Sequence, residues 1–245
     1  KKGPATNFTP EQYFGIMKQA LLMEELVSKH AAVMDKYDPQ KKVALVVDEW
    51  GGWYDVEPGT NPGFLFQQNT MRDAMIAGVT LNIFNNHADR VRIANLAQCV
   101  NVLQAVILTD KEKMILTPTY HVMEMYNVHQ DATLVPVNFT NSSFVMGKDS
   151  LPALSVSASR DKAGLLHISL VNIDPSKAAT ISLDMGSAAP TSVTGRILAT
   201  PSVQDYNSFQ QPDKVKPTSY NGATLKGGTL QVKLPAASVI VLELK

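Results

Sequence analysis

Two acids and two tryptophans directly follow a short apolar run in the first third of the chain. The stretch VALVVDEWGGWY, residues 43–54, carries Asp48, Glu49, Trp50 and Trp53 just beyond its first five apolar residues. A carboxylate at such a place could act as a nucleophile, a general base or a metal ligand, and tryptophan rings offer flat apolar faces on which a sugar can stack. The alternative is structural, with an Asp-Glu pair capping a loop and both tryptophans in the core.

The element before these residues decides between the two interpretations. The run KKVALVVDEW, residues 41–50, predicts a parallel strand that is covered on both faces. In parallel β/α folds the reacting groups collect at the carboxyl ends of the strands. Because Asp48 and Glu49 occupy such an end, the functional interpretation is favoured.

Helical patterns surround this strand. Thr9 is suited to cap a helix that has Pro10 in its first turn, Gln12 completes a Thr-x-x-Gln capping box, and Asp38-Pro39 ends the helix. The other elements predicted for this half are a helix over about 67–83, a strand within 92–108 and a short helix over 117–130 with Thr117 as its cap. The first half therefore alternates helix and strand.

The sequence changes character after about residue 131. Short alternating runs rich in Val, Ile, Ser and Thr follow one another, separated by turn signals such as Asn221-Gly222 and Gly227-Gly228. This pattern predicts an antiparallel β-sandwich, so we expect a β/α domain over residues 1–133 and a β-sandwich domain over 134–245. The first half holds about two β/α units, whereas a closed barrel needs eight and about 250 residues.

The motifs of the first half resemble a known family. Residues 47–130, which contain the DEW, EPGTNPG and LTPTYHV blocks in order, are similar to the C-terminal part of the catalytic barrel of family 51 α-L-arabinofuranosidases. The helix over 13–39 is similar to the same family, and LPAASVIVLELK at the end looks like the last strand of its accessory sandwich. The resemblance implies the C-terminal portion of a (β/α)8 barrel followed by an antiparallel β-sandwich domain.

The resemblance also implies roles for single residues. Glu49 falls on the catalytic nucleophile of a retaining glycosidase, Trp53 on a tryptophan that lines the sugar site, and Gln98 on a glutamine that reaches a sugar hydroxyl. Asp48 and Trp50 would be support residues. Gly51 departs from the family pattern, where Asn is common, and this leaves the course of the loop open.

A second carboxyl group is expected but not found. Retention needs one about 5 Å from the nucleophile to protonate the leaving oxygen and later to activate water. In the family this is a Glu that follows an Asn at the end of the fourth barrel strand, and this chain contains no Asn-Glu pair. We therefore expect the chain to be a C-terminal piece of a larger enzyme.

Composition limits the other possibilities. Lys and Arg number 22, equal to Asp and Glu, which argues against nucleic acid as a partner, and no apolar run approaches the roughly 20 residues that span a membrane. Cys99 is the only cysteine, so it forms no internal disulfide, and we expect it to be a small buried side chain. His87 with Asp89 and His121 with Glu124 lack the spacing of a metal site, and we expect neither a metal nor a cofactor.

Three functions remain from the sequence. The first is a retaining, exo-acting α-L-arabinofuranosidase that removes terminal arabinofuranosyl residues from plant oligosaccharides or polysaccharides. The second is a sugar-binding or assembly module without catalysis, and the third is another retaining glycosidase of the same clan, acting on xylosides or glucosides. The expected partners are an arabinofuranosyl oligosaccharide or polysaccharide, the remaining barrel portion or other copies of the chain, and a homo-oligomer is implied by the resemblance. The compartment stays open.

Overall fold

The computed structural model describes residues 3–96 and 98–245. Its three α-helices are α1 (Pro10–Tyr37), α2 (Met71–Asn86) and α3 (Pro118–Tyr126), with short 3-10 helices at Pro62–Phe64, Asn127–His129 and Gly186–Ala188. The strands are β1 (Leu45–Val47), β2 (Val91–Ala94), β3 (Ile107–Asp110), β4 (Lys113–Leu116), β5 (Thr133–Leu134), β6 (Ser143–Met146), β7 (Asp149–Pro152), β8 (Leu154–Arg160), β9 (Leu166–Asn172), β10 (Ala179–Asp184), β11 (Val193–Ala199), β12 (Thr218–Ser219), β13 (Ala223–Lys226), β14 (Thr229–Leu234) and β15 (Ser238–Leu244).

Helix α1 begins where the capping box places it. The Thr9 side chain accepts from the Gln12 N–H, the Gln12 side chain accepts from the Thr9 N–H, and Pro10 is the first helical residue. The far end of α1 is tied to the strands by Arg90, whose fully buried guanidinium pairs with Asp35 and Asp38 and donates to the Val43 carbonyl. This contact fixes where β1 begins.

Strands β1 and β2 form a parallel pair connected through α2. Val46 lies opposite Ile93, and Val47 lies opposite Ala94. The prediction that the first strand is covered on both faces is wrong for the described residues, because Val46 is 42% and Ile93 is 51% exposed. One face of the pair packs toward the helices, and no described element covers the other.

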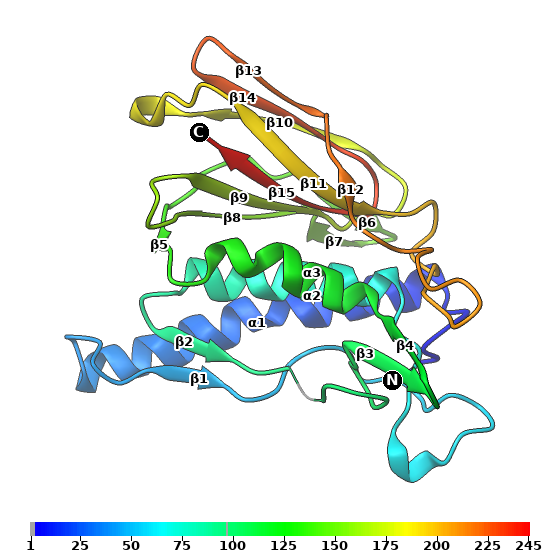
Figure 1. Ribbon diagram of the computed structural model, residues 1–245. Coiled ribbons are helices and arrows are strands. Elements are labelled where there is room, and N and C mark those ends of the chain that lie inside the picture. Colours follow the sequence, from blue (N-terminus) through cyan, green and yellow to red (C-terminus); the bar gives the residue numbers. More distant parts are fainter. Residues whose placement is uncertain (1–2, 97) are drawn as a thin grey trace.

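Two antiparallel sheets make up the rest of the chain. The larger has the order β12-β11-β15-β9-β8-β5, and the smaller has the order β10-β14-β13. Figure 1 shows the smaller sheet stacked on one face of the larger sheet and the three helices on its other face. Strand β9, in the middle of the larger sheet, is buried at every residue because both of its faces are covered.

Helix α2 joins the two halves of the chain. It packs against β8, β9 and β15, and a side chain on Gly78 would meet Val171 at 2.8 Å, so the close approach of helix and sheet requires glycine there. Buried residues from both halves form one continuous hydrophobic core. The loops before α2 and after β2 are thereby held on a rigid base.

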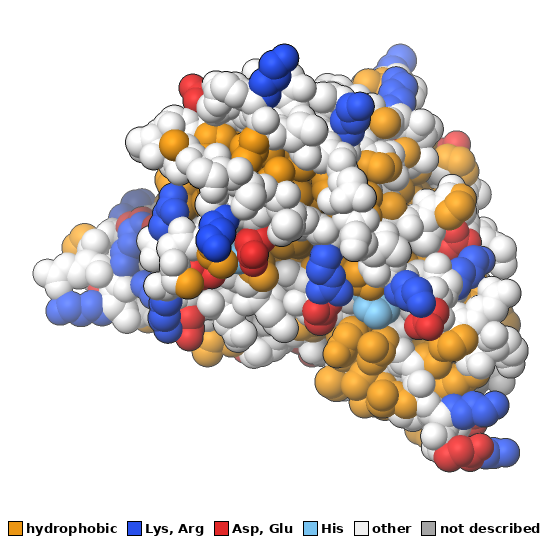
Figure 2. All heavy atoms as spheres, turned by 45° about the horizontal axis from the view of Figure 1, so that its top comes forward, with side chains coloured by type: hydrophobic (Ala, Val, Ile, Leu, Met, Phe, Trp, Pro, Cys, Tyr) orange, Lys and Arg blue, Asp and Glu red, His pale blue; other side chains and the backbone are white. Residues whose placement is uncertain are grey.

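The sequence did not predict the β3–β4 hairpin. Leu108 and Ile115 from its two strands pack with Ala105, Phe66 and Phe209 in a small core of their own. No described helix is long and apolar enough to cross a membrane. On the face seen in Figure 2, basic and acidic side chains are interspersed, as the balanced composition indicates.

Candidate active site

Most of the residues singled out from the sequence line one cavity. Its volume is about 310 Å³, and it is lined by Glu49, Trp50, Gly51, Gly52, Trp53, Leu65, Gln98 and Leu103. Glu49 and Trp53 from one loop are brought together there with Gln98, which lies more than forty residues further along the chain. Asp48 is exposed and lies outside the lining.

The parallel pairing of β1 and β2 explains this convergence. The Asn95 N–H donates to the Val47 carbonyl at 2.8 Å, which extends the pairing to the carboxyl ends of both strands. Glu49 follows one of these ends and Gln98 follows the other. Since the carboxyl ends of neighbouring parallel strands meet at the same edge, their following loops enclose a common space.

The two tryptophans have different environments. Trp50 is 7% exposed, and its ring meets Phe84 edge-on with centroids 6.0 Å apart. Its buried Nε1 has no hydrogen-bond partner among the described residues. Trp53 is 47% exposed and lines the cavity, whereas the buried Trp50 anchors the loop to the core.

The backbone conformation of the loop after β1, which carries Glu49 and Trp53, depends on two glycines. Gly51 has φ +113°, and a side chain there would lie 2.7 Å from the Gln104 amide oxygen. A side chain on Gly52 would lie 2.3 Å from the Tyr54 hydroxyl. Both positions therefore require glycine, which explains the departure from the family pattern at Gly51.

A buried hydrogen-bond network supports the loop from below. Gln104 donates through Nε2 to the Gly52 carbonyl and to Asp73 Oδ1, and the Tyr54 hydroxyl donates to the same oxygen at 3.0 Å. The other Asp73 oxygen accepts from the Thr70 N–H at 2.7 Å and so caps α2. Burial raises the pKa of Tyr54 well above its usual value, which keeps this hydroxyl a donor.

Sequence reasoning missed Gln104, Tyr54 and Asp73 as parts of the site. The available signal was the Thr70-x-x-Asp73 pattern, which is typical of a helix N-terminus and ties the loop to α2. Sequence reasoning was also wrong about Cys99, which is exposed. Cys99 lies in the turn after β2, where its carbonyl accepts from the Val106 and Ile107 N–H groups, and this turn holds its side chain outside the core.

The cavity can supply one half of a two-carboxylate mechanism. Among the described residues that line it, Glu49 is the only acid. A single carboxylate can attack or accept a proton, but the mechanism also needs a second carboxyl group. The described residues contain no group of three or more potential metal ligands. His87 instead meets Glu24 of α1 at 2.7 Å, and Glu124 accepts from Arg196 at 2.7 Å.

The fold and the cavity define a class of protein. In this class a β/α unit, here β1, α2 and β2, packs on antiparallel sheets and carries a polar cavity at the carboxyl ends of its strands. A family model described as the α-L-arabinofuranosidase C-terminal domain matches residues 48–238. The chain therefore belongs to this family, and the resemblance seen in the sequence is confirmed.

Individual relatives agree with the family assignment. An intracellular exo-α-L-arabinofuranosidase from Bacteroides ovatus is 46% identical over the whole chain, which covers 48% of that protein. A family 51 arabinofuranosidase structure from Xanthomonas axonopodis pv. citri superimposes with a TM-score of 0.97 at 48% identity, covering 100% of this chain and 50% of the other. A family 51 α-L-arabinofuranosidase from Bifidobacterium longum, at 24% identity and a TM-score of 0.77 over 92% of this chain and 48% of the other, shares the fold. The chain thus spans about half the length of these relatives.

Proposed function

We propose that the protein carrying this chain is a retaining, exo-acting α-L-arabinofuranosidase with Glu49 as its nucleophile. The observation that carries the proposal is the convergence of Glu49, Trp53 and Gln98 on one cavity of about 310 Å³. A carboxylate, an accessible aromatic face and an amide are the groups needed to attack, stack and orient a sugar. The names of the relatives supply the sugar, L-arabinofuranose.

The reaction proceeds in two steps. A Glu49 carboxylate oxygen forms a bond to the anomeric carbon while the bond to the leaving oxygen breaks, and a second carboxyl group protonates that oxygen. Water then attacks the same carbon, gives its proton to the second carboxylate, and releases Glu49. Since no other acidic residue lines the Glu49 cavity among the described residues, the second carboxyl group is expected from the part of the protein outside this chain.

The architecture proposed for this function has two parts. Residues 1–133 form the end of a (β/α)8 barrel, in support of which β1 and β2 are parallel and are joined through α2. Residues 134–245 form an accessory β-sandwich, in support of which two antiparallel sheets are stacked. The remaining barrel strands are the partner of the open β1–β2 pair. We further propose a homo-oligomer and an intracellular location, the latter because a full-chain relative is named intracellular.

Substitution of Glu49 tests the proposal. In the full-length protein, Glu49→Gln removes the nucleophile but keeps the shape of the side chain. We expect kcat/KM for an aryl α-L-arabinofuranoside to fall about a thousandfold or more, with an unchanged circular dichroism spectrum. The matched control is Glu112→Gln on the exposed turn between β3 and β4, which should leave the rate unchanged.

The rival functions predict other results. A non-catalytic module binds arabino-oligosaccharides but releases no chromophore, even as the wild type. A xylosidase or glucosidase turns over the corresponding aryl glycoside faster than the arabinofuranoside. Near-normal turnover by Glu49→Gln would show that Glu49 is not the nucleophile. Proton NMR of the first-formed arabinose anomer checks whether the reaction retains the anomeric configuration.

A further inference from the structure

One long loop of the β-rich half leaves the sheets and reaches the first half of the chain. It comprises residues 200–217, here called the β11–β12 loop, and contains no helix and no strand beyond one isolated bridge. Figure 1 shows it, in orange, beside the ends of the helices. Because neighbouring antiparallel strands such as β11 and β12 need only about two to five connecting residues, the sheet itself does not require a loop of this length.

The β11–β12 loop caps helix α2. The Met71 N–H donates to the Asp205 carbonyl at 2.8 Å. The Arg72 N–H donates to the Val203 carbonyl at 3.1 Å and to the Thr70 hydroxyl at 3.2 Å. These are the first two N–H groups of α2, and no carbonyl inside a helix can accept from them. Since Met71 and Arg72 are buried, the loop takes the place of water at this end of the helix.

Asn207 extends the same loop to the start of α3. Asn207 is 1% exposed, and its Nδ2 donates to the carbonyls of Leu116 and Val215 at 2.9 and 2.8 Å. Its Oδ1 accepts from the Val215 N–H at 2.7 Å, which closes the loop on itself. Leu116 directly precedes Thr117, the N-cap of α3. One buried amide therefore holds both the β11–β12 loop and the start of α3.

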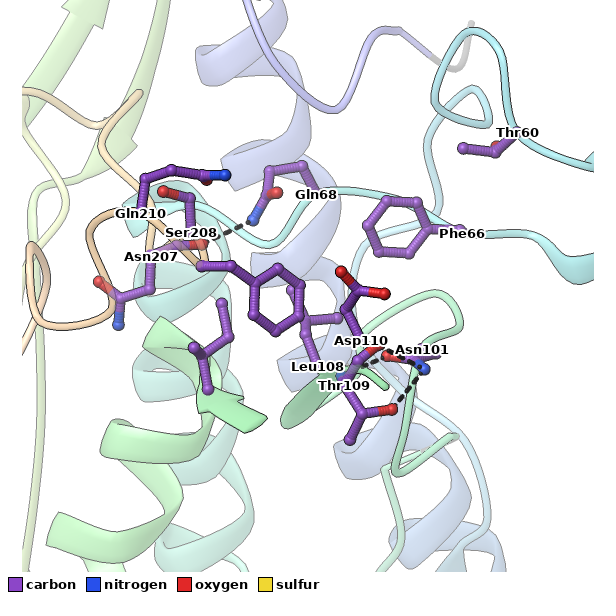
Figure 3. A pocket seen from close by; sticks show the side chains of 12 residues that line it. Thr60, Phe66, Gln68, Asn101, Leu108, Thr109, Asp110, Asn207, Ser208 and Gln210 are labelled. Carbon is purple, nitrogen blue, oxygen red and sulfur yellow. Dashed lines mark hydrogen bonds between the residues drawn. The ribbon is translucent and has the colours of Figure 1, made fainter. Parts of the chain in front are cut away.

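Two glutamines add contacts to this junction. Gln68, in the segment before α2, donates through Nε2 to the Asn207 carbonyl at 3.4 Å, a contact drawn as a dashed line in Figure 3. Gln204 of the β11–β12 loop donates through Nε2 to the carbonyl of Phe8 at 2.6 Å, just before α1. The β11–β12 loop thus contacts the segments that precede all three α-helices.

The loops of the candidate active site end at these same segments. The loop with Glu49 and Trp53 runs from β1 to α2, and the segment with Gln98 runs from β2 through the β3–β4 hairpin to α3. The pairing of β1 with β2 fixes where both begin. The contacts with the β11–β12 loop fix where both end.

Buried hydrogen bonds connect the capped end of α2 to the backbone near Glu49. Asp73 lies in the first turn of α2, and its Oδ1 accepts from Gln104 Nε2 at 3.3 Å. The same Nε2 donates to the Gly52 carbonyl. A displacement of the first turn of α2 would therefore be passed to Gly52, three residues from Glu49.

We propose that the β11–β12 loop is a positioning element of the active site and that Asn207 is the positioning residue that holds it. Asn207 does not line the Glu49 cavity, so it acts through the starts of α2 and α3. The inference rests on the proposed function, because that function makes Glu49 the nucleophile. It makes the β-rich half a part of the catalytic unit, in contrast to a separable sugar-binding module.

The test compares two buried asparagines in the full-length protein. Asn207→Ala removes the side-chain hydrogen bonds that join the loop to the start of α3. The matched control is Asn172→Ala, because Asn172 is 0% exposed and its side chain bonds residues of the β-rich half, namely Asp174, Lys177, Leu234 and Pro235. Both variants should lower the Tm by several degrees.

Turnover and hydrogen exchange separate positioning from stability. At a temperature where circular dichroism shows each variant to be folded, we expect kcat for an aryl α-L-arabinofuranoside to fall about tenfold to a hundredfold in Asn207→Ala. It should stay unchanged in Asn172→Ala. Backbone amides of residues 49–54 and 98–104 should exchange about tenfold faster in Asn207→Ala alone, as measured by mass spectrometry.

Gln68→Ala keeps the test informative if Asn207→Ala fails to fold. It removes the contact with the Asn207 carbonyl from a half-buried side chain of the first half. We expect it to lower kcat roughly threefold and to speed exchange at residues 49–54.

Unchanged kcat and exchange in whichever of these variants folds, or equal losses in Asn207→Ala and Asn172→Ala, would overturn the proposal. Faster exchange without a loss of kcat would also overturn it, because Asn207 would then serve stability alone. If the wild type releases no chromophore, the proposed function fails, and exchange at residues 49–54 then decides whether Asn207 positions the Glu49 loop.

Discussion

At the scale of single residues, the position of Glu49 depends on the backbone two residues later. Gly51 has φ +113°, a conformation that side-chain-bearing residues rarely adopt, and the Gln104 side chain fills the space where a Cβ would be. Gln104 in turn bonds Gly52 and Asp73, which connects the loop to α2. The position of Glu49 therefore depends in part on Gln104 and Asp73, which do not line the cavity.

Alanine at Gly51 tests this dependence. We expect Gly51→Ala to destabilise the protein by about 1–3 kcal/mol through backbone strain and to lower kcat/KM for an aryl arabinofuranoside by about tenfold to a hundredfold through displacement of Glu49. Urea unfolding and initial rates measure the two effects. The matched control is Gly59→Ala, which has φ +81° but nothing within 4 Å, so it should lose stability and keep activity. Full activity of Gly51→Ala would show that the loop does not position Glu49 for the proposed reaction.

The sequence predicted the convergence of Glu49, Trp53 and Gln98 but not its support. The order of elements places Glu49 at a strand end by a general rule, whereas the place of Gln98 in the same site was implied by the resemblance to the family. The support depends on contacts between residues far apart in the chain, such as Gln104 with Gly52 and with Asp73, at separations of 52 and 31 residues. No local pattern encodes such a pairing.

At the scale of elements, the half-buried His129, in the short 3-10 helix after α3, contacts the larger sheet. His129 Nδ1 lies 2.7 Å from the Ser159 hydroxyl on β8, and its Nε2 meets the Ser169 hydroxyl on β9. A serine hydroxyl can donate or accept, so neutral imidazole can donate from one ring nitrogen and accept at the other in this arrangement. Burial, with a smaller contribution from the charge on His167, lowers the pKa of His129 to about 4.

This histidine should make stability depend on pH. In the unfolded chain His129 titrates near 6.5, so between pH 6.5 and about 4 the unfolded state binds more protons than the folded state. The free energy of unfolding then falls as pH falls through this window, by about 3 kcal/mol in total, and this contribution levels off below pH 4. Urea unfolding at a series of pH values measures the slope. We expect His129→Gln to flatten it and His30→Gln, at an exposed position on α1, to leave it unchanged.

The long elements were predicted better than the short ones. The capping box of α1 and the Thr117 cap of α3 are local signals, and both are present in the structure. The β3–β4 hairpin was missed because its turn uses Lys111 at φ +54° where glycine or asparagine is the usual signal. The exposure of β1 was missed because its apolar sequence indicates a buried strand but does not show whether the element that covers it belongs to the same chain.

At the scale of the whole molecule, the two halves share one core. The change in sequence character near residue 131 coincides with the change from helices to sheets, and the boundary between 133 and 134 stays a prediction. Composition gave no sign that α2 of the first half packs on β8 and β9 of the second. Residues 207–210 of the second half also line a cavity of about 560 Å³ together with Phe66 and the β3–β4 hairpin of the first half, so both halves contribute to it.

The open face of the β1–β2 pair has a consequence for the chain studied by itself. Val46 and Ile93 lie opposite each other on this face, and Val43 beside them is 60% exposed. Exposed apolar strands with free edges promote pairing with other chains. We therefore expect the isolated chain of 245 residues to self-associate at micromolar concentration, as measured by size-exclusion chromatography with light scattering.

Substitution on that face distinguishes self-association through the β1–β2 pair from non-specific hydrophobic association. Val46→Thr with Ile93→Thr keeps residues that favour strands but removes apolar surface, so it should shift the isolated chain toward the monomer. The control Val145→Thr changes a valine that is 57% exposed on the separate β6–β7 hairpin and should leave association as it is. In the proposed barrel of the full-length protein, the other strands cover the same face, so the double variant should also weaken their packing there. An isolated wild-type chain that stays monomeric across the concentration range would mean that the open face of the β1–β2 pair needs no partner.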